Sequence, residues 1–250
     1  MIFRQLFDQE TSTYTYILAD KETREAVIID PVREQLERDL AILRELDLKL
    51  LYALDTHVHA DHVTGLGPLR EATGCKTVAS RHAKVDCHDL PVGEGSRIRF
   101  GKHELVVLET PGHTDACLSY VTGDRSMVFT GDALLIRGTG RTDFQQGNAE
   151  KLYRSITEKL FSLPDETLVY PGHDYKGRMV STIGEEKRFN PRVGQGKSLE
   201  EFQTIMANLD LPKPRYIDVA LPANLACGLA PEEGGVVASP EPAAGGNGAR

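Results

Sequence analysis

The chain has 250 residues, of which 40% are hydrophobic and 26% charged, and its formal net charge at pH 7 is −8. A chain of this length buries one substantial core, so we expect one domain rather than several. The acidic balance argues against nucleic acid or an anionic membrane as a partner, because phosphate groups bind basic surfaces.

No apolar run reaches the roughly 20 residues that cross a bilayer, and residues 1–8 lack the core of a signal peptide. We therefore expect a cytoplasmic protein or, in an organellar setting, a protein of the mitochondrial matrix. The cysteines are widely spaced and form no C-x-x-C pair, which favours neither a zinc ribbon nor a disulfide framework. We expect unreactive thiols at all four positions, which are Cys75, Cys87, Cys117 and Cys227.

Strands and helices alternate through the first half of the chain. Residues 13–18 and 26–29 alternate as paired strands do, and the polar turn between them predicts a hairpin. The next expected elements are, in chain order, a helix over 32–43, a strand at 50–54, a helix at 66–72 and a strand at 77–79.

The second half repeats this strand-rich pattern. Its expected elements are strands at 98–100, 105–108, 118–121 and 127–130, a helix over 149–163 and a strand at 168–170. Strands flanked by helices in two similar halves predict an α/β protein with an αββα sandwich. A capping box at 198–201 opens one further helix, which runs to about Asn208. Residues 231–250 are rich in Pro, Gly and Ala and predict a disordered tail, which leaves 1–230 as the folded domain.

The strand expected at 50–54 runs directly into the motif Thr56-His57-Val58-His59-Ala60-Asp61-His62. His57 and His59 are two residues apart, so in an extended segment their rings project to the same side. The next two ligand-type residues follow on the turning loop. Metal ions bind neutral imidazoles and ionised carboxylates, and both forms are present near pH 7.

Three later residues, each after an expected strand and in a turn that contains glycine, complete the pattern: His113, Asp132 and His173. Loops at one end of a rigid sheet collect functional groups, and glycine lets the backbone approach closely. A lone histidine after a strand is more often a packed or surface residue than a ligand. Three histidines within residues 57–62 reverse that weighting, and the seven residues together predict a metal site.

At these seven residues the chain resembles the metallo-β-lactamase superfamily, whose H-x-H-x-D-H motif and later His, Asp and His it matches. The likeness narrows at residues 56–65, 130–138, 140–147 and 173–175, which are similar to the glutathione persulfide dioxygenases. This resemblance covers residues 3–228. It implies a four-layer αββα sandwich with a short helix and loop extension at the C-terminus.

Two metal centres are compatible with these ligands. The residues alone include every ligand of a dinuclear zinc hydrolase, with Asp132 between two zinc ions, and so predict a glyoxalase II-like hydrolase of glutathione thioesters. The resemblance implies instead one Fe(II) per chain on His57, His113 and Asp132, a facial triad that leaves positions open for substrate and O₂. Ligand type does not decide, because imidazole and carboxylate bind zinc more tightly than ferrous iron. With one iron, four residues become supporting groups rather than ligands to a second metal: His59, Asp61, His62 and His173.

The resemblance implies a persulfide dioxygenase, which oxidises the terminal sulfur of glutathione persulfide with O₂ and water and releases sulfite and glutathione. The chain's own cysteines are not required. The segment 231–250 is too short for a fused sulfurtransferase, so we expect the persulfide donor to be a separate protein. The resemblance also leaves room for a homodimer.

Glutathione carries two carboxylates, so an acidic protein needs local basic groups to bind it. Residues 173–192 contain five Lys and Arg against three Asp and Glu. Arginine binds carboxylates through two parallel hydrogen bonds. We expect Arg141 and Arg192 to bind the substrate, Tyr175 to donate its hydroxyl, and Thr114 to reach the same ligand. A non-catalytic binding protein on this fold would be expected to lack ligands, whereas this chain keeps all seven.

Overall fold

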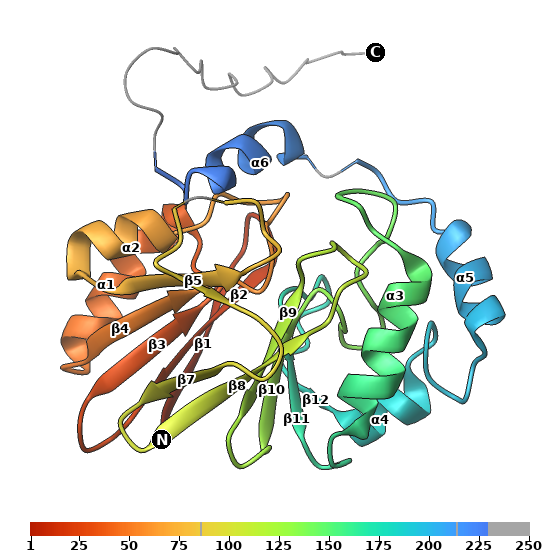
Figure 1. The fold of residues 1–250 in the computed structure, drawn as a ribbon, viewed down its shortest axis with the longest axis horizontal. Helices are drawn as coiled ribbons and strands as arrows, with labels where there is room; N and C mark the ends of the chain where they lie inside the picture. The colour runs from red at the N-terminus through yellow and green to blue at the C-terminus, as the bar shows by residue number, and fades with distance from the viewer. Residues whose placement is uncertain (86, 214, 230–250) are drawn as a thin grey trace, which may run out of the picture.

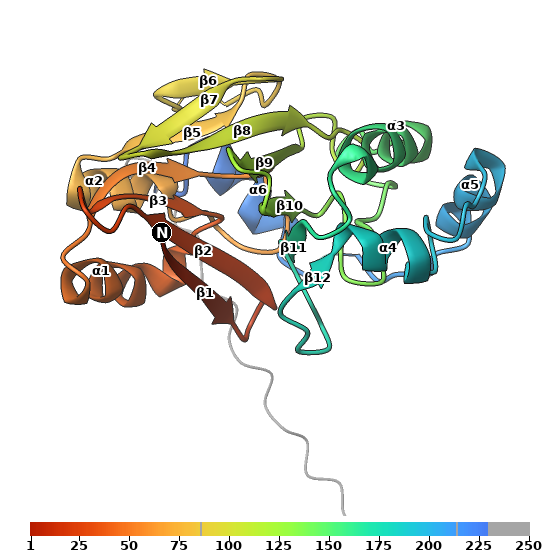
Figure 2. The ribbon, with the colours of Figure 1, turned by 90° about the horizontal axis from the view of Figure 1, so that it is seen from below.

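The computed structural model describes residues 1–85, 87–213 and 215–229, and in it two six-stranded sheets pack face to face (Figures 1 and 2). The first sheet runs in chain order through β1 Ile2–Asp8, β2 Thr13–Ala19, β3 Glu25–Ile29, β4 Lys49–Leu54, β5 Lys76–Ser80 and β6 Leu90–Val92. The second runs in the order β12 Ser181–Thr182, β11 Leu168–Pro171, β10 Met127–Gly131, β9 Leu118–Thr122, β8 His103–Glu109 and β7 Arg97–Phe100.

Helices cover the outer face of each sheet, as Figure 1 shows for α1 and α2 beside the first sheet and α3, α4 and α5 beside the second. On the first side lie η1 Arg33–Gln35, α1 Leu36–Glu45 and α2 Leu66–Thr73. On the second lie α3 Ala149–Arg154 with its continuations η2 Ser155–Lys159 and η3 Leu160–Ser162, then α4 Ile183–Phe189 and α5 Leu199–Ala207. A last helix, α6 Ile217–Leu225, crosses the end of both sheets.

Three apolar layers hold these elements together, and β2 shows how the sequence builds two of them. Tyr16 and Leu18 point into the core between the sheets, whereas Ile17 and Ala19 point into the core beneath α1 and α2. This alternation is the two-residue period of a strand buried on both faces. A third core joins the second sheet to α3, α4 and α5. The predicted four-layer αββα sandwich and its N-terminal hairpin are confirmed.

Several elements were not predicted, and each has a weak local signal. β1 lies at a sheet edge with polar residues breaking its alternation, and β6 contains Pro91. α6 contains Pro222 and buries only three of its nine residues, so its apolar periodicity is poor. None of the helices in the described ranges has the length and apolar character needed to span a bilayer. The predicted tail at 231–250 lies outside the described residues.

The prediction that all four cysteines are free thiols is wrong for two of them. Cys87 and Cys227 form a disulfide between residues 140 positions apart, with their Cα atoms 6.1 Å from each other. Sequence spacing does not reveal such a pair, because the fold alone brings its members together. Cys75 and Cys117 are free and buried. Burial raises the pKa of the Cys117 thiol to about 12, which keeps it protonated and unreactive.

Candidate metal centre

All seven candidate ligands lie in loops at one end of the two sheets. The H-x-H-x-D-H motif follows β4, and the loop with His113 joins β8 to β9. Asp132 and His173 emerge side by side because β10 and β11 are parallel neighbours. Ligand atoms of His57, His113 and Asp132 all lie within 4.8 Å of one another, and a second such group consists of His59, Asp61 and His62.

The ring of His57 is oriented by a buried chain of hydrogen bonds. The Asp30 carboxylate accepts from the Thr56 backbone N–H at 2.7 Å and from the Thr56 hydroxyl at 2.9 Å. With its proton donated to Asp30, the hydroxyl oxygen accepts from Nδ1 of His57 at 3.0 Å. This arrangement places the proton on Nδ1 and leaves Nε2 of His57 as a free lone pair for a metal.

His113 and Asp132 are each held at one atom and free at another. Nδ1 of His113 donates to the carbonyl oxygen of Arg141 at 2.7 Å, so Nε2 is the atom that faces the other ligands. Oδ1 of Asp132 is bonded to Nδ1 of His173 at 2.7 Å. The free atoms, Nε2 of His113 and Oδ2 of Asp132, are 3.7 Å apart. One metal ion fits between them, because metal–ligand bonds to nitrogen and oxygen are about 2.0–2.2 Å long.

The protonation states also suit a metal. Burial, followed by the neighbouring His59 and His113, lowers the pKa of His57 well below its usual value, so this imidazole is neutral. Burial alone would raise the pKa of Asp132, but His173, His113 and His57 outweigh it and lower that pKa. A neutral imidazole at His57 and an ionised carboxylate at Asp132 are therefore already in place for a metal.

The second group is dominated by hydrogen bonds among its own members. Oδ2 of Asp61 lies 2.8 Å from Nδ1 of His62 and 2.9 Å from Nε2 of His173, and the Thr13 hydroxyl donates to it at 3.2 Å. His173 thus lies between two carboxylates, Asp61 and Asp132. Burial opposes its charge, but these two carboxylates raise the pKa of His173 well above its usual value.

Two nitrogen atoms of this group have no hydrogen-bond partner among the described residues. They are Nδ1 of His59 and Nε2 of His62, both buried. The other His59 nitrogen, Nε2, lies 3.2 Å from Asp30, which raises the pKa of His59 to about 9 against the opposing effect of burial. Buried polar atoms are rarely left unpaired, so the donor set fits a metal-binding end of the fold.

Glycine is required where the loops meet. A Cβ added to Gly140 would lie 2.4 Å from the carbonyl oxygen of Asp132 and 2.8 Å from the ring of His113. Gly131 has a φ of +50°, and a Cβ there would lie 2.4 Å from the Thr56 hydroxyl. The expectation that glycine permits close approach of these loops is confirmed by these distances.

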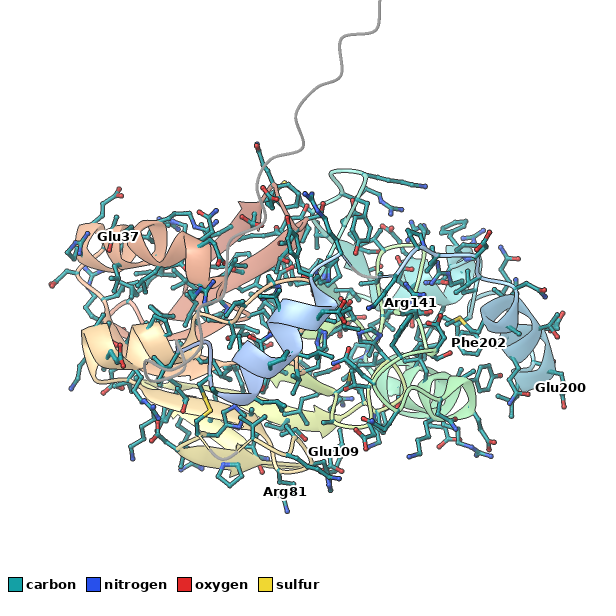
Figure 3. All side chains as sticks on the ribbon, turned by 90° about the horizontal axis from the view of Figure 1, so that it is seen from above. Glu37, Arg81, Glu109, Arg141, Glu200 and Phe202 are labelled. Atoms are coloured by element: carbon teal, nitrogen blue, oxygen red, sulfur yellow. A yellow bond between two sulfur atoms is a disulfide. The ribbon has the colours of Figure 1, made fainter. Side chains whose placement is uncertain are left out.

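Arg141, predicted to bind substrate, has its guanidinium engaged within the protein. Nε and Nη2 donate to the Asp143 carboxylate at 2.7 and 2.8 Å, and Nη1 donates to the carbonyl oxygen of Pro212 at 2.6 Å. The group also lies over the Phe144 ring, 4.5 Å from its centroid. Figure 3 labels Arg141 beside the segment that joins α5 to α6. These contacts make Arg141 an anchor for that segment and, through its carbonyl, a support for His113.

The other predicted substrate residues differ in how free they are. Arg192 is half-buried, donates to the Thr139 carbonyl oxygen at 2.5 Å, and forms no ion pair within the described ranges. Tyr175 is 72% exposed and its ring stacks parallel to His173 with centroids 6.0 Å apart. Thr114 is buried, and its hydroxyl lies 3.2 Å from Cys117 Sγ inside its own turn. The first two remain available to a ligand, and the third is committed to the turn.

Sequence reasoning missed four residues that support the site. Asp30 follows the strand at 26–29, which is the same signal that identified the ligands, so the sequence could have identified it. The other three gave no local signal because their partners are distant in sequence. These are Thr13, Gln145, which donates to the Val58 carbonyl oxygen at 2.7 Å, and Asn224.

Two facing sheets with a doubled histidine and aspartate cluster at their loop end define a metallo-β-lactamase fold. Residues 9–173 match the family model of the metallo-beta-lactamase superfamily. The chain is 35% identical over 189 residues to hydroxyacylglutathione hydrolase of Cereibacter sphaeroides, which covers 70% of this chain and 69% of that protein.

Two relatives are much more similar. Persulfide dioxygenase ETHE1, mitochondrial, of Mus musculus is 54% identical over 230 residues, 92% of this chain and 89% of that protein. The crystal structure of ETHE1 from Myxococcus xanthus is 60% identical, has a TM-score of 0.89, and covers 92% of this chain and 100% of that chain. The chain belongs to the persulfide dioxygenase family of the metallo-β-lactamase superfamily.

Proposed function

We propose that the protein oxidises glutathione persulfide with O₂ and water to sulfite and glutathione. One persulfide, one O₂ and one water give one glutathione and one sulfite, with both atoms of O₂ transferred to the terminal sulfur. The observation that carries the proposal is the identity of more than half of the aligned residues to persulfide dioxygenases along nearly the whole chain. The hydroxyacylglutathione hydrolase that would support the hydrolase alternative is a more distant relative, at 35% identity.

The reaction itself separates the two alternatives. An O₂ electrode measures oxidation of glutathione persulfide. Hydrolysis of a glutathione thioester is measured in parallel, by its own assay, on the same protein sample. We expect O₂ uptake matched by sulfite, and no thioester hydrolysis above background. Thioester hydrolysis without O₂ uptake would replace the proposal by the hydrolase.

We further propose one Fe(II) per chain, held by His57, His113 and Asp132. The free atoms of these residues converge, and each is oriented through its other atom. Ferrous iron, when bound, would supply the redox chemistry with O₂. The two histidines and the carboxylate would hold the iron at the loop end of the two sheets.

In the proposed single-metal site, His173 supports two carboxylates and is not a ligand. Both of its nitrogens are engaged by carboxylates, Asp132 on one side and Asp61 on the other. We propose that His59, Asp61, His62 and His173 act as supporting groups, and that the charge on His173 stabilises the carboxylate of Asp132.

For the substrate we propose Arg192 as the residue that binds a glutathione carboxylate, and exposed Tyr175, which stacks on His173, as a second substrate residue. Arg192 carries a charge without an acidic partner in the part of the chain that the structure describes. It also donates a hydrogen bond to the carbonyl oxygen of Thr139. The next residue, Gly140, packs closely against Asp132 and His113. Arg141 and Thr114 remain predictions, and the engaged donors of Arg141 favour a supporting role.

Arg192→Ala should raise KM for glutathione persulfide about 10- to 100-fold and lower kcat much less. The reason is that charge-assisted hydrogen bonds to a remote carboxylate stabilise bound substrate and transition state alike, by about 1.5–3 kcal/mol. Steady-state O₂ uptake measures both constants. Arg188→Ala, on exposed Arg188 of the same segment, is the matched control and should leave KM unchanged. An unchanged KM in the Arg192 variant would remove this residue from the binding site.

Thr56→Val should lower metal affinity about 10- to 100-fold, because it removes the acceptor that orients His57 and one donor to Asp30. Valine has nearly the same volume as threonine, so the packing is preserved. Chelator competition measures the affinity. Thr204→Val, at an exposed position of α5, is the control. Equal metal affinity in all three proteins would show that the Asp30–Thr56–His57 chain does not support the ligand.

We also propose a cytoplasmic location, or the mitochondrial matrix in an organellar setting, and a separate sulfurtransferase as donor of the persulfide. A homodimer remains a prediction. Sedimentation of the purified protein tests the homodimer directly.

A further inference from the structure

The C-terminal helix α6 contacts the metal-binding loop through one buried side chain. Asn224 is 4% exposed and lies against residues about 160 positions earlier in the chain. Its Nδ2 group donates to the carbonyl oxygens of His59 and His62, at 2.8 and 2.9 Å. Its Oδ1 accepts from the backbone N–H of Thr64 at 2.8 Å.

These bonds use the full donor capacity of the amide and one acceptor position, and all of them go to a single loop. Water does not readily replace these bonds, because His59, His62 and Thr64 are all buried. An alanine at position 224 would leave two carbonyls and one N–H of the loop unpaired, at about 1–3 kcal/mol for each group. An aspartate would place a carboxylate against two carbonyl oxygens. Only a side-chain amide of this length donates to both carbonyl oxygens and accepts from the N–H of Thr64.

The helix is fixed in place by its ends rather than by an apolar face. Of its nine residues only Ile217, Ala220 and Asn224 are buried. Just after the helix, Cys227 is joined to Cys87 by the disulfide, and its carbonyl oxygen accepts from the Gly67 N–H at 2.9 Å. Figure 3 shows the pale blue helix crossing the centre of the molecule, with the labelled Arg141 near the segment that precedes it.

The approach of the following residue to the loop is equally close. Gly228 has a φ of +72°, and a Cβ on it would lie 2.0 Å from the Thr64 carbonyl oxygen. At the preceding end, Arg141 donates to the Pro212 carbonyl oxygen. The H-x-H-x-D-H loop is therefore contacted both by Asn224 and by the residue after the helix, Gly228, while Pro212 before the helix is attached to Arg141.

We propose that Asn224 is a positioning residue for the metal centre, and that α6 acts as a clamp on the H-x-H-x-D-H loop. The side chain fixes the backbone at His59 and His62, and through it the direction in which His57 presents Nε2. The proposal holds for one metal or two, because the loop supplies ligands in either case. Its failure is therefore distinguishable from failure of the proposed reaction.

The test compares Asn224→Ala and Asn224→Asp with the wild-type protein. Two readouts are used: the rate at which a chelator removes bound iron, and amide hydrogen exchange of residues 57–64. We expect iron release about 10- to 100-fold faster in both variants, as for loss of a partner that orients a ligand. We expect exchange at 57–64 to accelerate at least about 10-fold, while the strands of both sheets stay protected. Asn208→Ala, at the exposed end of α5, is the matched control and should change neither.

Wild-type iron release together with wild-type exchange at 57–64 in the Asn224 variants would overturn the proposal. If these variants do not fold, Cys87→Ser provides a second test, because it releases the end of α6 and leaves Asn224 and the loop intact. We expect the same two changes in smaller measure. Uniformly faster exchange over the whole chain, with none specific to 57–64, would indicate a purely structural helix and would also overturn the proposal.

Discussion

Alanine at His57, His113 or Asp132 should remove the metal, whereas alanine at His62 should leave one iron per chain. The first three present free atoms to one point and have their other atoms occupied by Thr56, Arg141 and His173. Loss of any one leaves two ligands, too few to hold ferrous iron against water. His62 belongs to the group held together by Asp61, so its loss should lower activity by about 10- to 100-fold without removing the iron.

Metal analysis of the four variants, purified after growth in iron, measures this difference. Circular dichroism confirms that each variant is folded. His103→Ala, on a histidine of β8 away from the ligand groups, is the control and should keep wild-type metal content. If the wild-type protein holds two metals and the His62 variant holds one, the single-metal site is wrong.

Gly140→Ala should nearly abolish metal binding although residue 140 is not a ligand. Its added methyl group would lie 2.4 Å from the Asp132 carbonyl oxygen and 2.8 Å from the His113 ring, so both ligands would have to move. Such overpacking costs about 1–3 kcal/mol, and here the displaced groups are the ligands themselves. We expect metal affinity to fall at least about 100-fold, measured by chelator competition.

The same loop contains a matched control. A Cβ on Gly138 would meet nothing closer than the Leu135 Cβ at 3.8 Å, an ordinary contact. Gly138→Ala should therefore keep wild-type affinity. Equal affinities for the two glycine variants would mean that the loop moves away without disturbing the ligands, and would contradict the close packing at Gly140.

The layered fold and the candidate ligands could be predicted because their signals are local. The strand with Tyr16 and Ile17 is predicted from its own residues, which point alternately into two cores. The metal site is predicted from His57 and its neighbours in the motif. Each later ligand follows a buried strand and stands beside a glycine. Asp30 carries the first of these signals too, at the end of β3, and its role was missed because a single carboxylate after a strand is common.

The remaining features depend on contacts between distant segments. The Cys87–Cys227 disulfide and the Asn224 clamp join residues that are more than 100 positions apart, and nothing in the flanking sequence indicates either partner. Arg141 remains a prediction as a substrate residue, and the orientation of its guanidinium depends on Asp143 and on the chain at 211–212. Sequence identifies the type of side chain in such cases, and the tertiary structure decides which donors remain free.

Metal content and O₂ uptake, measured on the same sample, test the single-iron dioxygenase most directly. Metal-free protein is loaded with iron or with zinc, the metal bound per chain is counted, and each sample receives glutathione persulfide. We expect one iron per chain in the iron sample, with O₂ uptake matched by sulfite, and no O₂ uptake in the zinc sample. Two zinc ions per chain with thioester hydrolysis, and no O₂ uptake by the iron sample, would contradict the account.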